Sequence, residues 1–206
     1  MPASKHVYRY LPASEPGRAP LVLLHGSDGT ELDLLPLAGE LSPGAAQFGI
    51  RGGVALASGY AFFQRFPDRR VDEADLLARV SVLASCIETW CAALDLGPAP
   101  LAVGFSNGAI MATALLTAQP GLLAGAILFR SLSPFADDPG CDLARVPVLM
   151  IDGANDVRRS AGDGLRLAGR LRRAGAQVTH YVLPVGHSIT AADRTLAREW
   201  IRAQGF

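Results

Sequence analysis

Short apolar runs alternate with segments of helical spacing along most of the chain. The runs that predict strands cover residues 7–11, 19–26, 46–53, 101–106, 122–130, 146–153 and 177–184. The segments that predict helices cover residues 31–41, 72–94, 107–119, 162–175 and 191–204. This alternation is typical of a mostly parallel central sheet with helices on both faces, so we predict an α/β fold.

One stretch breaks the alternation. Residues 53–70, GVALASGYAFFQRFPDRR, show no clear period. The stretch is long for a plain connection, and such loops are often functional. No insertion is large enough to form a separate cap domain, so we predict that residues 1–206 form a single domain.

Composition narrows the choice of function. Half of the 206 residues are hydrophobic, and 19 basic residues balance 19 acidic ones, which argues against a nucleic-acid partner. The three cysteines form no disulfide framework and lie near no histidine at metal-ligand spacing, so we expect no metal. The chain begins without the apolar core of a signal peptide, and no apolar run approaches the length of a membrane span. We therefore expect a cytoplasmic protein that contacts no membrane.

The stretch LAVGFSNGA, residues 101–109, carries the first candidate for chemistry. A predicted strand meets a predicted helix at G-x-S-x-G, the pattern of a nucleophile elbow. Such a turn is so tight that side chains at Gly104 and Gly108 would collide, while Ser106 is left exposed at the strand end. The alternative is a tight strand-to-helix turn with an incidental serine, since the pattern is short.

A serine nucleophile needs a base, and the chain has only four histidines. His187 follows Pro184-Val185-Gly186 just beyond the last predicted strand, in a loop, where an imidazole can take the Ser106 proton. Its alternative role is a cap for the helix that follows. His180 lies inside a strand pattern and is expected to be structural, and His6 and His25 precede the serine.

The acid of a triad should lie between the serine and the histidine, after a strand. Asp156, in MIDGANDVRR, fits best and would hold the tautomer of His187. Asp152 is closer to the strand end and can instead organise the turn. Asp137 and Asp138, in SPFADDPG, follow an earlier strand and remain rival candidates.

An oxyanion hole needs two backbone N–H groups aimed at one point. Asn107, directly after the serine, supplies one, and the loop HGSDG, residues 25–29, should supply the other through Ser27. His25 and Asp28 would then shape that loop. The alternative is an ordinary glycine-rich turn before a helix.

Taken together, LVLLHGSDGTELD, IRGG, AFFQRF, GFSNGA, LMIDGANDVR and LPVGHSIT resemble the phospholipase/carboxylesterase family of α/β hydrolases over nearly the whole chain. The resemblance is strongest to small bacterial carboxylesterases of the hydroquinone-stress type, and it extends to acyl-protein thioesterases. It implies the α/β-hydrolase fold, a Ser106–His187–Asp156 triad, an oxyanion site at Ser27 and Asn107, no metal or organic cofactor, and a homodimer in many members. The sequence departs at HGSDGTELD, which lacks a further glycine, and at VRRSAGDG, which lacks a proline-containing turn.

These residues predict a serine carboxylesterase acting on small to medium esters through an acyl-enzyme. Phe62, Phe63 and Phe66, with Tyr60, are candidates to line the substrate pocket, or they pack within their own loop. A thioesterase would use the same groups, and a dienelactone-type hydrolase would carry cysteine in place of Ser106. A hydrolase-fold protein that only binds a ligand is the alternative outside catalysis.

Overall fold

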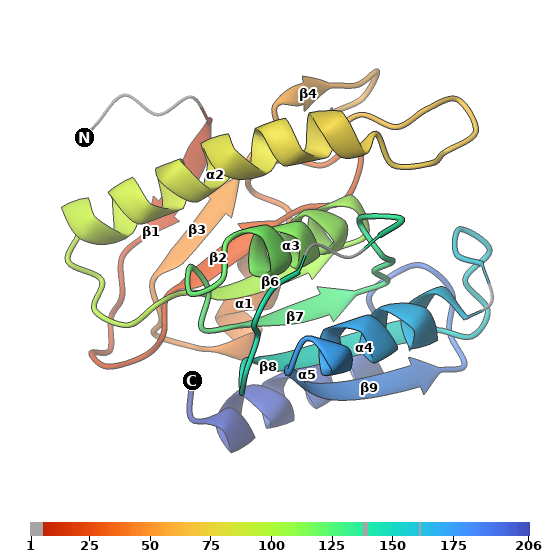
Figure 1. Ribbon diagram of the computed structural model, residues 1–206. Helices are drawn as coiled ribbons and strands as arrows, with labels where there is room; N and C mark the ends of the chain where they lie inside the picture. Colours follow the sequence, from red (N-terminus) through yellow and green to blue (C-terminus); the bar gives the residue numbers. More distant parts are fainter. Residues whose placement is uncertain (1–5, 138–139, 161) are drawn as a thin grey trace.

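Seven strands form one sheet in the computed structural model, which describes residues 6–137, 140–160 and 162–206 (Figure 1). The order across the sheet is β1-β3-β2-β6-β7-β8-β9, and only the edge strand β1 runs antiparallel to its neighbour. The strands are β1 (Tyr8–Leu11), β2 (Leu21–Leu24), β3 (Gln47–Ile50), β6 (Leu101–Phe105), β7 (Gly125–Phe129), β8 (Pro147–Gly153) and β9 (Gln177–Leu183). The mostly parallel α/β fold predicted from the alternation is confirmed.

Helices cover both faces of this sheet (Figure 1). They are α1 (Leu35–Leu41), α2 (Glu73–Ala93), α3 (Asn107–Ala118), α4 (Asp163–Arg173) and α5 (Ala191–Gln204). α2, α3 and α4 pack on one face, and α1 and α5 pack together on the other. Both faces of the central strands are therefore buried, which explains why β2, β6 and β7 read as continuous apolar runs.

Two local differences separate the structure from the sequence pattern. The predicted helix over 31–41 begins only at Leu35, because residues 31–34 form a turn in which the Thr30 hydroxyl donates to Asp33. The stretch over 53–70 contains a short hairpin, β4 (Val54–Ala55) with β5 (Tyr60–Ala61). A bridge between Gly29 and Tyr60 ties this hairpin to the loop that follows β2.

In the described part of the chain, α2 alone is long and apolar enough to cross a membrane, with a mean hydropathy of 1.4. This corrects the expectation that no segment approaches such a length. Core helices of soluble proteins reach the same length and composition, so this feature alone does not indicate a membrane span. The side chains that α2 buries beside the sheet are Leu76, Val80, Leu83, Ala84, Ile87 and Trp90.

The loops that carry the predicted site all leave the same edge of the sheet. β2, β6, β7, β8 and β9 are parallel, so their carboxyl ends point the same way. Ser27 follows β2, Ser106 follows β6, Asp156 follows β8 and His187 follows β9. Ligands bind at this edge in open α/β sheets, so the topology gathers these four residues where a site is expected.

Candidate active site

Ser106 sits on a strained turn between β6 and α3. Its backbone has φ 52° and ψ −106°, outside the ordinary regions for a residue with a side chain. A Cβ atom at Gly104 would lie 2.6 Å from the Cα of Ala109, and one at Gly108 would collide with the carbonyl oxygen of Leu24. Both glycines are therefore required by close backbone contacts, as the elbow pattern predicts.

The side chains of Ser106, His187 and Asp156 form one continuous chain of hydrogen bonds. His187 Nε2 lies 2.9 Å from Ser106 Oγ, and His187 Nδ1 lies 2.7 Å from Asp156 Oδ2. Because the carboxylate accepts, the proton of neutral His187 belongs on Nδ1, which leaves Nε2 free to accept from the Ser106 hydroxyl. The Asp156 side chain is 1% exposed and that of His187 is 14% exposed, so the pair is shielded from solvent.

The surroundings of the pair lower the pKa of both His187 and Asp156, but for different reasons. Burial lowers the pKa of His187 below its usual value, the contact with Asp156 works against this shift, and the charges of Arg159 and Arg158 add to it. Burial acts to raise the pKa of Asp156, but hydrogen bonds from His187 and the Arg158 amide outweigh it and hold that pKa below its usual range. At neutral pH the histidine is therefore uncharged and the aspartate is charged, which are the states a base and its orienting acid need.

The described rival acids do not bond to His187. Asp152 accepts from His180 Nε2 at 2.7 Å, and this pair joins β8 to β9. Asp137 is exposed, and Asp138 lies outside the described residues. Among the described candidates, Asp156 alone bonds to His187.

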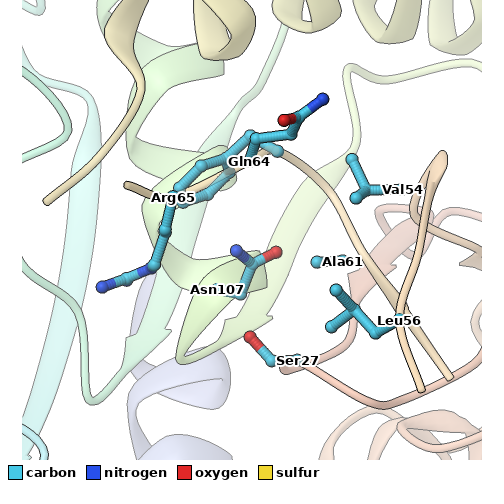
Figure 2. A pocket seen from close by; sticks show the side chains of 8 residues that line it. Ser27, Val54, Leu56, Ala61, Gln64, Arg65 and Asn107 are labelled. Carbon is cyan, nitrogen blue, oxygen red and sulfur yellow. The ribbon is translucent and has the colours of Figure 1, made fainter. Parts of the chain in front are cut away.

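Ser27 and Asn107 line the same pocket, of about 280 Å³ (Figure 2). Asn107 is the first residue of α3, where backbone N–H groups have no acceptor within the helix. Neither the Ser27 amide nor the Asn107 amide donates to any acceptor within the described residues. Two residues with unengaged amides therefore border one cavity, which is consistent with the predicted oxyanion site.

His25 fixes the loop that carries Ser27. Its ring is buried, its Nε2 accepts from the Gly52 amide at 3.0 Å, and its Nδ1 donates to the carbonyl of Gly26 at 2.6 Å. Burial lowers the pKa of His25, so the ring stays neutral and keeps these two opposite roles. The structure thus places His25 as the loop-shaping residue that its position predicts.

The three predicted pocket phenylalanines have different positions. Phe63 lines the pocket with Ser27 and Asn107. Phe62 is buried against the His25 ring, with centroids 4.8 Å apart, and does not line it. Phe66 is 43% exposed and stacks under the Arg70 guanidinium, outside the lining. Phe62 and Phe66 thus make contacts within the protein, as in the alternative of local packing, and Phe63 alone of the three lines this cavity.

The path of the irregular segment explains these different positions. Phe62 donates its backbone N–H to Asn107 Oδ1 at 2.7 Å, which pins the segment against the elbow. The apolar wall of the pocket comes instead from Val54, Leu56 and Ala61 of the hairpin, seen on one side of Asn107 in Figure 2. Without a regular period, the sequence could not indicate which of these side chains face the cavity.

Sequence reasoning missed Arg130, which supports the loop that carries His187. Arg130 is fully buried and follows β7 with a positive φ of 56°. It donates to the carbonyls of Gly186 and Ser188, the two residues that flank His187, at 3.0 and 2.8 Å. It also forms a buried ion pair with Asp193 at 2.7 Å, in the first turn of α5. Arg130 therefore holds both sides of the His187 backbone.

Arg159 was also missed, because the sequence shows it only as part of a basic pair. Its Nη2 donates to Ser106 Oγ at 3.1 Å, and its Nε donates to the Arg130 carbonyl at 2.8 Å. Ser106 thus accepts from a cation while its own hydroxyl can donate to His187.

No cluster of three or more metal-ligand side chains occurs among the residues that the structure describes.

The chain is similar to known hydrolases and carboxylesterases. No family model matches the chain. The chain is 34% identical over 183 residues to "Putative hydrolase MhqD" of Bacillus subtilis (strain 168), which covers 88% of this chain and 92% of that protein. The crystal structure of the Bacillus cereus carboxylesterase matches with a TM-score of 0.93 and 30% identity over 97% of this chain and 94% of that chain. The crystal structure of a carboxylesterase from Mesorhizobium loti matches with a TM-score of 0.92 and 30% identity over 98% of this chain and 97% of that chain.

Proposed function

Because the chain belongs to the α/β-hydrolase carboxylesterase family, we propose that it is a serine carboxylesterase that cleaves small to medium esters. The observation that carries the proposal is the unbroken series of hydrogen bonds from Ser106 through His187 to Asp156. A base that lies 2.9 Å from a nucleophile and 2.7 Å from an orienting acid is the geometric signature of nucleophilic catalysis.

In the first half of the reaction, His187 Nε2 takes the hydroxyl proton as Ser106 Oγ attacks the ester carbonyl carbon. The carbonyl oxygen becomes an oxyanion, which the free amides of Ser27 and Asn107 would bind, each donor contributing ~3 kcal/mol. His187 then returns the proton to the departing alcohol oxygen. The carbon–oxygen bond of the ester breaks, and an acyl group remains on Ser106.

In the second half, water takes the place of the alcohol. His187 removes one proton from it, the hydroxide attacks the acyl carbon, and the proton returns to Ser106 Oγ. The net change is one ester and one water converted to one carboxylic acid and one alcohol. Asp156 stabilises the charged imidazole in both halves through its bond to Nδ1.

The size of the pocket supports small substrates. A volume of about 280 Å³ is at the lower end for ligand sites. Val54, Leu56, Ala61 and Phe63 give it an apolar wall suited to a short alkyl or aryl group. A thioester has the same acyl chemistry, so thioesterase activity is the alternative within this proposal.

We also propose that the protein is cytoplasmic, acts on a small-molecule ester and needs no metal or organic cofactor. Nucleic acid and membrane are not among its proposed partners. A homodimer is proposed from the family resemblance alone.

Steady-state and burst kinetics with 4-nitrophenyl butanoate test the proposal. We expect turnover with a burst of about one nitrophenol per active site, and loss of both in Ser106→Ala. Folded wild-type protein that binds the ester without releasing nitrophenol would favour the ligand-binding alternative. Parallel assays with butanoyl thioesters separate esterase from thioesterase by the ratio of kcat/KM.

A further inference from the structure

Arg159 lies at the nucleophile with no acidic partner. Its guanidinium donates to Ser106 Oγ, to the Arg130 carbonyl through Nε and Nη2, and to the Arg158 carbonyl through Nη1 at 3.1 Å. All of these acceptors are uncharged. Within the described residues, no carboxylate lies at ion-pair distance from Arg159. A substrate anion could therefore bind here without displacing an existing ion pair.

A second arginine, Arg65, lines the same surface depression as Arg159. Arg65 is half-buried, lies over the Phe63 ring and donates to the Arg69 carbonyl at 2.8 Å, again without an ion pair to a described carboxylate. Burial, together with the charge of Arg65, lowers the pKa of Arg159 to about 10, although the charges of Asp156, Asp163 and Asp152 act in the opposite direction. Two poorly solvated cations that repel each other raise the free energy of the empty site, and a bound anion would relieve that cost.

Arg65 lines two cavities, and Arg159, which contacts Ser106, lines one of them. One is the apolar pocket of about 280 Å³, and Arg65 is part of its lining. The other is a basic depression of about 560 Å³ lined by Arg65, Arg158 and Arg159. Figure 2 shows the Arg65 side chain extending away from Val54 and Leu56, on the other side of Asn107. An ester bound across Ser106 would meet an apolar wall on one side and cations on the other.

None of the acidic groups of the depression forms an ion pair with these two cations, because each has another hydrogen-bond partner. They pair as follows: Asp68 with Arg70, Glu73 with the amide of Ala136, and Asp163 with Arg166 and the amide of Ser160. No described carboxylate therefore has to be displaced from Arg65 or Arg159 before an anion binds there.

We propose that the preferred substrates are esters that carry a carboxylate a few bonds from the scissile carbonyl, such as monoesters of short dicarboxylic acids. The carboxylate binds Arg159 and Arg65, and the uncharged group occupies the apolar pocket. The spacing is short because Arg159 Nη2 is only 3.1 Å from the oxygen that attacks the carbonyl carbon. This proposal rests on the proposed esterase function and names its substrate class.

Matched pairs of substrates test it. The mono-4-nitrophenyl ester of glutaric acid differs from 4-nitrophenyl pentanoate in one group, a carboxylate in place of a methyl. The pair 4-acetoxybenzoate and 4-methylphenyl acetate places the same change on the leaving group. We expect the wild type to favour the charged member of at least one pair, and Arg159→Gln and Arg65→Gln each to lower that ratio of kcat/KM about 10- to 100-fold.

The ratio is the informative quantity, because Arg159→Gln also removes a hydrogen bond to Ser106 and changes the rate with both members of a pair. Arg198→Gln, an exposed arginine on α5, is the matched control and should leave the ratio as in the wild type. Binding is measured separately by calorimetry on Ser106→Ala, with monomethyl glutarate against methyl pentanoate as probes. We expect Arg159→Gln in that background to abolish the preference for the anion.

The outcomes distinguish the two proposals. Hydrolysis of neutral esters with no anion preference, and ratios unchanged in both arginine variants, would overturn the substrate class and leave the esterase function intact. Arginine-dependent binding of monomethyl glutarate without any ester hydrolysis would refute the esterase function and support the anion site. Neither hydrolysis nor binding would refute both.

Discussion

Two histidine–aspartate pairs among the described residues have the same hydrogen-bond distance but different surroundings. His187 with Asp156 and His180 with Asp152 are both separated by 2.7 Å, and both are largely buried. The other ring nitrogen of His187 meets Ser106, whereas no hydrogen bond from the other nitrogen of His180 occurs within the described residues. A short contact to a carboxylate therefore does not make a histidine a base, because the second nitrogen must also face a nucleophile.

The two histidines are also held in different ways. His180 is part of β9 and is paired with Met150 in the ladder to β8, so the sheet fixes its backbone. His187 lies in a loop, and the side chain of Arg130 fixes the carbonyls on either side of it. A loop can place a side chain at the end of the sheet, but the loop backbone then needs a buried support such as Arg130.

The largest expected effect comes from neutralising the acid of each pair in turn. Asp156→Asn should lower kcat roughly 10⁴-fold, because an amide stabilises the wrong tautomer of His187 and no longer balances the imidazolium charge. Asp152→Asn is the matched control and should change kcat by less than about threefold. Steady-state kinetics with 4-nitrophenyl butanoate measures both. Equal losses in the two variants would show that the pairs are not functionally different.

Removing the support of the His187 loop should affect both folding and catalysis. Arg130→Met leaves Asp193 charged and buried, and we expect the free energy of unfolding to fall by about 3–5 kcal/mol. The double variant Arg130→Met/Asp193→Asn removes that buried charge and should recover part of the stability without recovering kcat. Urea denaturation and steady-state kinetics separate the two effects. If the double variant regained full kcat, Arg130 would have no positioning role.

The pH profile gives the smallest effect and reports the charge around His187. Burial and the nearby arginines lower the pKa of His187, so it stays neutral and active to a lower pH than an ordinary histidine. The acid limb of kcat/KM should therefore have its midpoint below 6.5, the usual value. Arg159→Gln removes a positive charge, so the limb should move to higher pH. An unchanged limb would contradict this electrostatic coupling.

The sequence was most informative where local sterics determine the structure. The glycines around Ser106 predict the elbow, and the order of Ser106, Asp156 and His187 along alternating strands and helices predicts that they meet at one edge of the sheet. It was least informative where contacts join distant segments. Arg130 reaches Asp193 across 63 positions, and Arg159 reaches Ser106 across 53. No local period encodes such contacts, and none indicates which of Phe62, Phe63 and Phe66 lines the cavity.

The central claim is that Ser106 is an activated nucleophile. Intact-mass spectrometry after exposure to a fluorophosphonate tests it most directly, on the wild type and on Ser106→Ala, with circular dichroism to establish that both are folded. The account predicts one covalent adduct per wild-type chain, located on Ser106 by peptide mapping and absent from the variant. A folded wild type that forms no adduct, or an adduct that persists in Ser106→Ala, would contradict it.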